Sequence, residues 1–207
     1  MQLYYTPGAC SLAPHIVFKW LKVPYTLLLA DKSSRVFQQA SPMLTVPTLV
    51  VDGMGSLTQC GAILRYQTTL PGGEIYGPNP NDPLEVYEFD HWECFLTGDM
   101  HPSFFPFFSP QRYTTDDNES SLASVRAAAV PLVEKVFTVL DRHLSEHDFI
   151  VGGRISIIDA YVTPMLRWAK MGLPDTCSKY PHVMRHYQMM CENNGVKSAM
   201  TQQNISA

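Results

Sequence analysis

The chain has 207 residues, of which 45% are hydrophobic and 16% charged, and its formal net charge is −4. This composition is typical of a globular protein with a substantial core, folded as one large domain or two small ones. The Lys and Arg residues form no cluster, which argues against nucleic acid or an anionic membrane as a partner. No apolar run reaches the roughly 18 residues of a membrane span, and no signal-peptide pattern opens the chain.

The cysteines show no paired spacing. An odd number of scattered cysteines is typical of a protein in a reducing compartment, so we expect a cytoplasmic location and free thiols. The five cysteines are Cys10, Cys60, Cys94, Cys177 and Cys191.

The first third of the chain alternates between strand-like and helix-like segments. The order strand, helix, strand, then two strands and a helix is the content of one small α/β domain. We expect strands at 2–5, 25–29, 46–51 and 56–58, helices at 12–21 and 61–69, and a short polar helix or loop at 31–39.

Residues 71–83 are rich in Pro, Gly and Asn, which indicates a linker. Beyond them the pattern is helical throughout. Ser156 and Asp159 resemble a capping box with Asp in place of Glu. We expect helices at 84–100, 120–144, 156–168 and 180–193, and therefore an α/β domain at 1–73, a linker at 74–83 and an all-helical domain at 84–207.

The most informative segment joins the first strand to the first helix, with the sequence Tyr-Thr-Pro-Gly-Ala-Cys-Ser at 5–11. The positive end of a helix dipole favours the thiolate form of a cysteine placed there, here Cys10. No second cysteine follows in a Cys-x-x-Cys spacing, so the pattern predicts a single thiol that bonds covalently to a small thiol such as glutathione. The alternative is a buried cysteine that acts as a small apolar group.

Several motifs in this order resemble one family. The segment 5–15, Val46-Pro47, His101, and 156–161 with Arg167-Trp168 are similar to the matching motifs of the cytosolic glutathione S-transferases, most closely the bacterial beta class. The resemblance covers nearly the whole chain. It implies a thioredoxin-like α/β domain followed by an all-helical domain, a homodimer, and glutathione as cosubstrate with no metal.

The resemblance also implies an activity. Glutathione thiolate would be conjugated to small electrophiles, or mixed disulfides would be exchanged through Cys10. In the beta class a histidine at the place of His101 lies near the sulfur, where it stabilises a thiolate or hydrogen-bonds an attacking species; the alternative is a capping or core histidine. Tyr5 and Ser11 are rival activating hydroxyls, and Ser11 is also a candidate helix cap.

The resemblance also gives a set of glutathione contacts. A cis proline at 47 would leave the backbone of Val46 free to pair with the ligand as an added strand. Gln59 and Cys60 stand where the family usually has Glu-Ser, so they supply no charge for the γ-glutamyl end and predict weakened binding. Besides Cys10, the predicted glutathione-binding residues are Arg35, with a solvated surface Arg as its alternative, Thr45, Val46, Pro47, Gln59, Cys60 and Cys94, the last reaching across the dimer.

Phe104, Phe105, Phe107 and Phe108 are candidates for an apolar electrophile pocket. Their alternative is an interdomain or dimer core. His143 and His147 match an inverted zinc-protease pattern, but no third ligand is evident, so we expect no metal there.

The predicted weakening of glutathione binding at its γ-glutamyl end leaves a second function as an alternative. A non-catalytic member of the same fold, acting as a binding or interaction protein, would tolerate such changes. Retention on immobilised glutathione separates the two.

Overall fold

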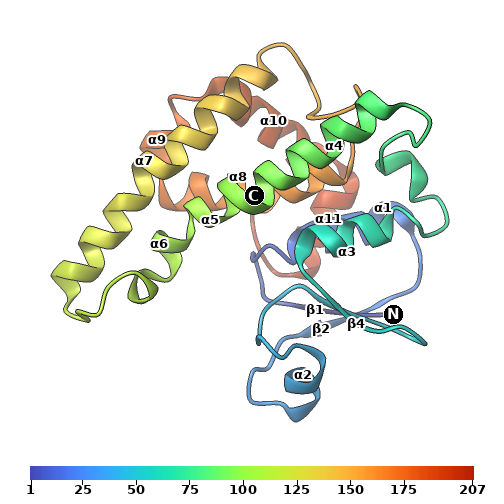
Figure 1. Ribbon diagram of the computed structural model, residues 1–207, viewed down its shortest axis with the longest axis horizontal. Helices are drawn as coiled ribbons and strands as arrows, with labels where there is room; N and C mark the ends of the chain where they lie inside the picture. Colours follow the sequence, from blue (N-terminus) through green and yellow to red (C-terminus); the bar gives the residue numbers. More distant parts are fainter.

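The computed structural model describes residues 1–207, apart from the side chain of Pro174. Figure 1 shows a small sheet domain with a larger helical domain packed on one of its faces. The sheet domain consists of β1 (Gln2–Tyr5), α1 (Leu12–Leu21), β2 (Thr26–Leu29), α2 (Arg35–Ala40), β3 (Thr48–Val51), β4 (Gly55–Thr58) and α3 (Cys60–Gln67).

A short 3-10 turn (Glu74–Tyr76) leads into the helical domain. None of the helices formed by the described residues is both long and apolar enough to cross a bilayer. The helical domain consists of α4 (Pro83–Phe95), a π-helical turn (Leu96–Met100), α5 (His101–Ser103), α6 (Phe105–Phe108), a 3-10 turn (Pro110–Arg112), α7 (Glu119–Leu144), α8 (Ile157–Gly172), α9 (Pro174–Cys177), α10 (Pro181–Glu192) and α11 (Asn194–Gln202).

The four strands form one mixed sheet in the order β2-β1-β3-β4. β1 and β2 are parallel, whereas β3 is antiparallel to both β1 and β4. The pairing of Thr48 with Thr58 brings the start of β3 beside the end of β4. Segments 45–47 and 59–60 therefore lie next to each other at the edge of the sheet where β1 also ends.

The two domains share one hydrophobic core. α1 and α3 cover one face of the sheet and in turn pack against the helical domain, while α2 covers the opposite face (Figure 1). Ile16 and Leu64 belong to the same buried cluster as Phe137 and Leu166. Burial of this continuous apolar surface fixes the two domains against each other, and it confirms the predicted α/β domain followed by a helical domain. The exact boundaries at 73 and 84 stay a prediction.

Helix capping explains where several helices begin. The side chain of Asp82 accepts hydrogen bonds from the first backbone N–H groups of α4, with Pro83 at the first helical position. Ser156 and Asp159 form the predicted capping box of α8. Asp159 is fully buried, and it also accepts hydrogen bonds from the Ile150 backbone and from His186.

Some elements differ in extent from the prediction, and the short helices α5, α6 and α9 and the longer α11 were not predicted. The third strand begins at Thr48 rather than at 46, because the proline after Val46 has no N–H for the ladder. The helix expected at 84–100 ends at Phe95 and continues as the π-helical turn, so that His101 begins a new short helix. The C-terminal helix α11 was not predicted, because Asn193-Asn194-Gly195 reads as a helix breaker; in the structure Asn193 caps α11 with its side chain.

Candidate active site

The turn between β1 and α1 places Cys10 at the junction of the two domains. Gly8 has a positive φ of 71°, and a Cβ there would lie 2.7 Å from an Arg167 nitrogen, so the position requires glycine. The indole N–H of Trp168 donates to the Gly8 carbonyl at 2.7 Å, and the Gly8 N–H donates to the Gln203 side chain at 3.0 Å. The helical domain therefore holds this turn from two sides.

Cys10 is nearly buried, with 8% of its surface exposed. As a thiol it donates to the carbonyl of Val46, with the two atoms 3.2 Å apart. A hydrogen bond from the Cys60 side chain lowers the pKa of Cys10 to about 5; burial opposes this shift, and His101 supports it through a hydrogen bond and its charge. These contacts favour the thiolate, the reactive form of Cys10.

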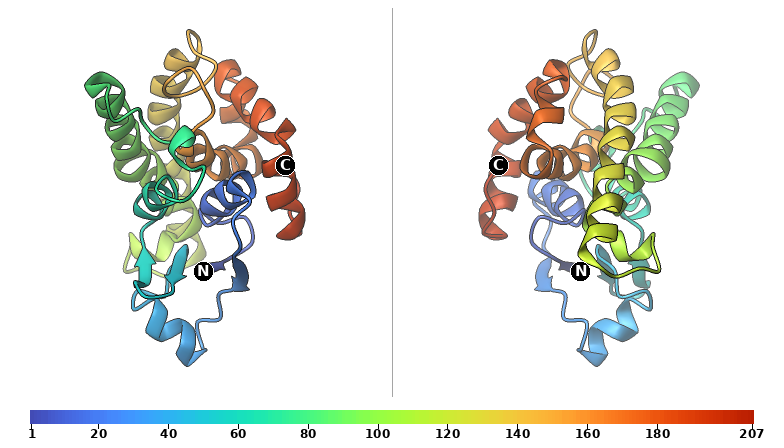
Figure 2. Two further views of the ribbon diagram at one scale, coloured as in Figure 1. Left: turned by 90° about the vertical axis from the view of Figure 1, so that its right-hand side faces the viewer. Right: turned by 90° about the vertical axis from the view of Figure 1, so that its left-hand side faces the viewer.

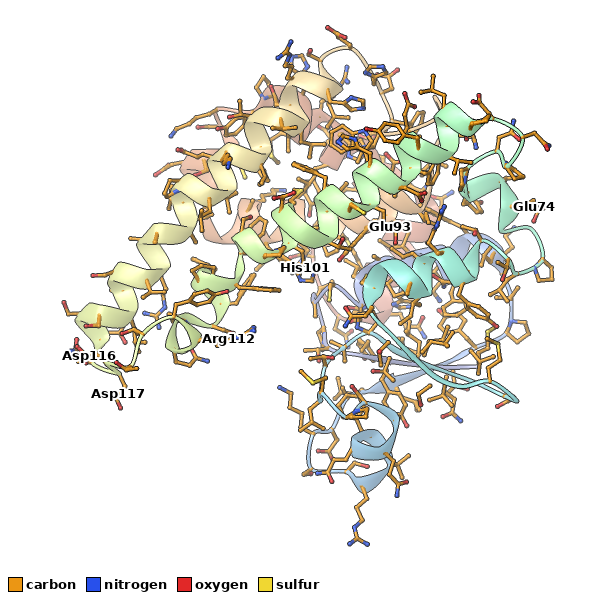
Figure 3. All side chains as sticks on the ribbon, in the orientation of Figure 1. Glu74, Glu93, His101, Arg112, Asp116 and Asp117 are labelled. Atoms are coloured by element: carbon orange, nitrogen blue, oxygen red, sulfur yellow. The ribbon has the colours of Figure 1, made fainter. Side chains whose placement is uncertain are left out.

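His101 approaches Cys10 from the helical domain. It begins α5, on the side of the helical domain that faces the sheet domain (Figure 3). Its Nδ1 lies 3.2 Å from the hydroxyl of Tyr161, and its ring packs against Phe105 and Trp168 at centroid distances of 5.2 Å each. These contacts fix the ring beside the sulfur.

A cavity of about 690 Å³ opens between the two domains above Cys10. One wall is mostly backbone and small side chains, and the other is aromatic with two arginines, a combination that suits a polar ligand on one side and an apolar one on the other. The sheet domain contributes Thr6, Pro7, Gly8, Ala9, Cys10, Ala30, Lys32, Leu44, Thr45 and Val46. The helical domain contributes His101, Phe105, Phe107, Phe108, Ser109, Arg112, Arg167, Trp168, Met171 and Gly172.

The cavity brings together many of the residues predicted for it. Thr45 and Val46 lie in its wall next to Cys10. The Val46–Pro47 peptide bond is cis, as the resemblance implied. No hydrogen bond within the described residues uses the Val46 N–H. The predicted residues that line the cavity are Cys10, Thr45, Val46, His101, Phe105, Phe107 and Phe108.

Phe104 does not line the cavity. Its side chain is 1% exposed and packs edge-on against Trp168, with the ring centroids 5.5 Å apart. The tight turns of α5 and α6 direct it into the core while Phe105 and Phe108 face outward. Phe104 therefore belongs to the core that the two domains share, as its alternative interpretation stated, and not to the predicted electrophile pocket.

Arg35 also lies away from the cavity. It is the exposed first residue of α2, on the face of the sheet opposite α1. Lys32 lines the cavity instead, because the turn before α2, held by hydrogen bonds from Ser33 to Asp31, brings it to the rim. The exposed position of Arg35 corresponds to its alternative interpretation, a solvated surface arginine.

The two hydroxyl groups predicted as alternative activators of the thiol, those of Tyr5 and Ser11, do not line the cavity. The Tyr5 side chain lies outside the cavity lining, with its ring 6.5 Å from that of His15. Ser11 is fully buried, and its hydroxyl is hydrogen-bonded to both the N–H and the carbonyl of Thr6. It makes no capping bond to the first turn of α1, so the helix-cap alternative was wrong: Ser11 closes the turn that carries Cys10.

The three residues expected around the γ-glutamyl end differ in burial. Gln59 is exposed and adopts a positive φ of 72°, beside the segment 45–47. Cys60 is buried, with its sulfur 3.6 Å from the Cys10 carbonyl oxygen. Cys94 is exposed on α4. None of the three lines the cavity formed by the described residues.

Some site residues were not predicted from the sequence. Lys32, Arg112 and Met171 reach the cavity only through the tertiary fold. Tyr161 supports His101 from the buried side of α8, and burial raises its pKa far above the usual range, which keeps its hydroxyl protonated. Arg167 and Trp168, which also line the cavity, could be identified from the sequence, because they follow the capping box in the motif that resembles the family.

The His-x-x-Glu-His segment forms a helix end. The His143 Nε2 atom lies 2.8 Å from the Ile150 carbonyl oxygen, and the His147 Nδ1 atom lies 2.9 Å from the His143 carbonyl oxygen. Among the described residues, no three or more His, Cys, Asp or Glu side chains gather as metal ligands.

Comparison with known proteins identifies the family. The family model "Glutathione S-transferase, C-terminal domain" matches residues 98–194. Glutathione S-transferase GST-4.5 of Xanthomonas campestris is 34% identical over 173 residues, covering 82% of each protein. Among solved structures, a glutathione S-transferase from Xylella fastidiosa superposes with a TM-score of 0.88 at 28% identity, covering 99% of each chain. A sphingomonad glutathione S-transferase complexed with glutathione gives 0.86 at 27% identity, covering 100% of each chain.

The chain belongs to the glutathione S-transferase family. The nearly complete coverage confirms the resemblance to the bacterial beta class over both domains. It also favours a transferase over the non-catalytic alternative.

Proposed function

We propose that this protein is a glutathione transferase that binds glutathione above Cys10 and passes its thiolate to small apolar electrophiles, or exchanges mixed disulfides through Cys10. The observation that carries the proposal is the cavity in which a thiolate-biased cysteine, His101 and an aromatic wall meet. The free thiols and the absence of a membrane-spanning helix among the described residues are compatible with a cytoplasmic location.

In the proposed complex, the cysteinyl backbone of glutathione pairs with Val46 as an added strand. The N–H of Val46, which no described residue uses, donates to the ligand, and Lys32 at the rim attracts its glycine carboxylate. The glutathione sulfur then lies between Cys10 and His101. The electrophile lies against Phe105, Phe108 and Trp168.

Two reactions follow from this placement. In conjugation, His101 donates a hydrogen bond that stabilises the glutathione thiolate, which attacks an electrophilic carbon and expels its leaving group. In disulfide exchange, the Cys10 thiolate attacks glutathione disulfide, forms a mixed disulfide and releases one glutathione thiolate.

The function is tested with immobilised glutathione, an activated aryl halide such as chlorodinitrobenzene, and adduct mapping after exposure to glutathione disulfide. We expect retention, enzymatic conjugation, and glutathione attached to Cys10. A protein that is not retained and does not accelerate conjugation would be a non-catalytic member of the family. Modification of the exposed Cys94 with Cys10 untouched would remove Cys10 from the proposed mechanism.

The substitution Gln59→Glu should tighten glutathione binding. Gln59 lies beside Val46, where a carboxylate would meet the ligand's ammonium group, and the neutral amide supplies no charge. We expect a gain of roughly 1–2 kcal/mol, about ten-fold in affinity, measured by calorimetry. Gln188→Glu, at an exposed position of α10 away from the cavity, is the matched control and should change nothing. Unchanged affinity in Gln59→Glu would place the γ-glutamyl end elsewhere.

We expect the protein to be a homodimer. α4 forms the outer flank of the helical domain (Figure 2) and exposes Leu84 and Tyr87, which are 66% and 64% accessible. A groove of about 360 Å³ beside it is lined by apolar residues of α4 and α7, including Phe95, Leu132 and Val139. Two-fold pairing would cover these surfaces.

Sedimentation equilibrium should therefore give twice the chain mass of 23.3 kDa at micromolar concentration. Tyr87→Glu should shift the equilibrium toward monomer, whereas Tyr113→Glu on the loop before α7 should not. A wild-type monomer would contradict the dimer.

A further inference from the structure

We propose that Cys10 and Cys60 act as a two-cysteine pair, in which Cys60 resolves a mixed disulfide on Cys10 and gives the protein a dithiol–disulfide exchange activity. This inference rests on the proposed function in one respect, that Cys10 accepts glutathione. The sequence did not predict dithiol–disulfide exchange, because Ala13 occupies the place of the second cysteine of a Cys-x-x-Cys motif that would begin at Cys10. The structure supplies the second thiol from another element.

The geometry places the two thiols together at the domain junction. Cys10 lies in the turn before α1, and Cys60 is the first residue of α3, which packs beside α1. The Cys60 sulfur is 3.6 Å from the Cys10 carbonyl oxygen, so the two residues are in direct contact. Both belong to the same buried cluster. Cys10 lines the cavity and Cys60 does not. An incoming disulfide therefore reaches Cys10 first, with Cys60 buried behind it.

Charge coupling sets the order of the two steps. Burial raises the pKa of Cys60 well above its usual range, and the nearby charge and hydrogen bond of Cys10 raise it further. The resting pair therefore holds one thiolate, on Cys10, and one thiol. Once Cys10 is in a mixed disulfide it carries no charge, so this second cause disappears and Cys60 ionises more readily. Cys60 is thus activated by the loading of Cys10.

A carboxylate next to Cys60 can take up its proton. A Cβ on Gly61 would lie 2.5 Å from an oxygen of Glu93, so the Glu93 side chain rests against the first turn of α3. Figure 3 shows Glu93 on the side of α4 that faces α3. Burial raises the pKa of the Glu93 carboxyl, with Arg65 acting in the opposite direction. A carboxyl held in this way accepts a proton more readily than an exposed one.

The reaction balances with glutathione alone as the redox partner. Cys10 thiolate attacks glutathione disulfide, forming Cys10–S–S–glutathione and releasing one glutathione thiolate. Cys60 gives its proton to Glu93 and attacks the Cys10 sulfur; the bond to glutathione breaks, the Cys10–Cys60 bond forms, and Glu93 passes the proton to the departing glutathione thiolate. Glutathione disulfide has been reduced to two glutathiones and the dithiol oxidised. The reverse, with two glutathiones, restores the dithiol.

The experiment exposes the intact protein to glutathione buffers of increasing oxidised fraction, quenches with acid, and maps thiols by mass spectrometry without reduction. In the wild type we expect a Cys10–Cys60 linked peptide and a chain lighter by two hydrogen atoms, with little stable glutathione adduct. In Cys60→Ser we expect a lasting glutathione adduct on Cys10, because nothing displaces it. Cys191→Ser, which removes a free thiol on α10 outside the cavity, is the matched control and should behave as the wild type.

The outcomes separate this inference from the proposed function. A wild type that holds glutathione on Cys10 at every ratio, with Cys60 alkylatable after unfolding, overturns the resolving role and leaves the proposed function intact. A wild type in which Cys10 never takes up glutathione removes the proposed Cys10 step instead. The thiol map of the wild-type protein alone distinguishes these results. The inference can therefore be tested even if Cys60→Ser does not fold.

Discussion

Alkylation of Cys10 by iodoacetamide should titrate with a midpoint near pH 5 and be level from pH 7 upward. The Cys60 side chain, with support from His101, lowers the pKa of Cys10 to about 5 against the opposing effect of burial. At pH 7, about two units higher, a group with that pKa is about 99% ionised. Free glutathione in the same solution, an ordinary thiol, should still gain reactivity above pH 7. Rates are read from the Cys10 peptide by quenched mass spectrometry.

Variants identify the origin of this low pKa. Cys60→Ala removes the hydrogen bond that contributes most, and His101→Phe removes the second donor, so each should move the midpoint upward. Cys60→Ser keeps a donor and should restore part of the shift. Cys94→Ser is the control and should leave the profile of Cys10 unchanged. A Cys10 midpoint above pH 8 in the wild type would mean that burial outweighs the hydrogen bonds.

The predictable part of the site is local in sequence. The run 5–11 placed Cys10 at a helix start because a strand, a Pro-Gly turn and an amphipathic helix follow one another within a few residues, and the structure has them in that order. The same holds for the capping box of α8, whose Ser156 and Asp159 are one turn apart. Short-range patterns of this kind determine an element's start with little help from the rest of the chain.

The remainder depends on contacts between distant segments. The Cys60 thiol donates to the backbone carbonyl of Cys10, fifty residues away, and no spacing rule links the two residues. Phe104 and Phe105 are neighbours in sequence, yet one is core and the other cavity wall, since adjacent residues of a helical segment point about 100° apart. Lys32 rather than the predicted Arg35 lines the cavity, because the direction of a loop side chain follows from tertiary packing.

His15 also depends on contacts with residues distant in sequence, because it links the active-site turn to the C-terminal helix α11 and the residue after it. His15 is fully buried on α1, and its Nε2 lies 3.0 Å from the Gln202 side-chain oxygen. The Gln203 amide lies 2.9 Å from the His15 Nδ1, while its oxygen accepts the Gly8 N–H. With Gln203 donating to Nδ1, His15 is neutral and donates from Nε2. A protonated His15 would lose the bond from Gln203.

The protein should therefore lose stability as the pH falls from about 6.5 to about 4. Burial lowers the pKa of His15 to about 4, with Lys19 adding to the shift and Gln202 opposing it. The unfolded chain protonates near pH 6.5, so below that pH protons favour unfolding, until the folded state also binds one. The difference of about 2.5 units corresponds to about 3 kcal/mol, fully present above pH 7 and gone below pH 4.

Urea unfolding at several pH values measures this loss. Cys10, His143 and Glu93 have shifted pKa values and contribute to the slope as well. Cys10, down to about pH 5, and His143 act in the same direction as His15, and Glu93 acts in the opposite one. The decisive comparison is therefore between variants. His15→Gln should lower stability at pH 7 and remove about 3 kcal/mol of the fall between pH 6.5 and 4, whereas the exposed His91→Gln should keep the full slope. Equal slopes in wild type and His15→Gln would show that folding does not shift the pKa of His15, and the link from α11 to the Cys10 turn would then need another description.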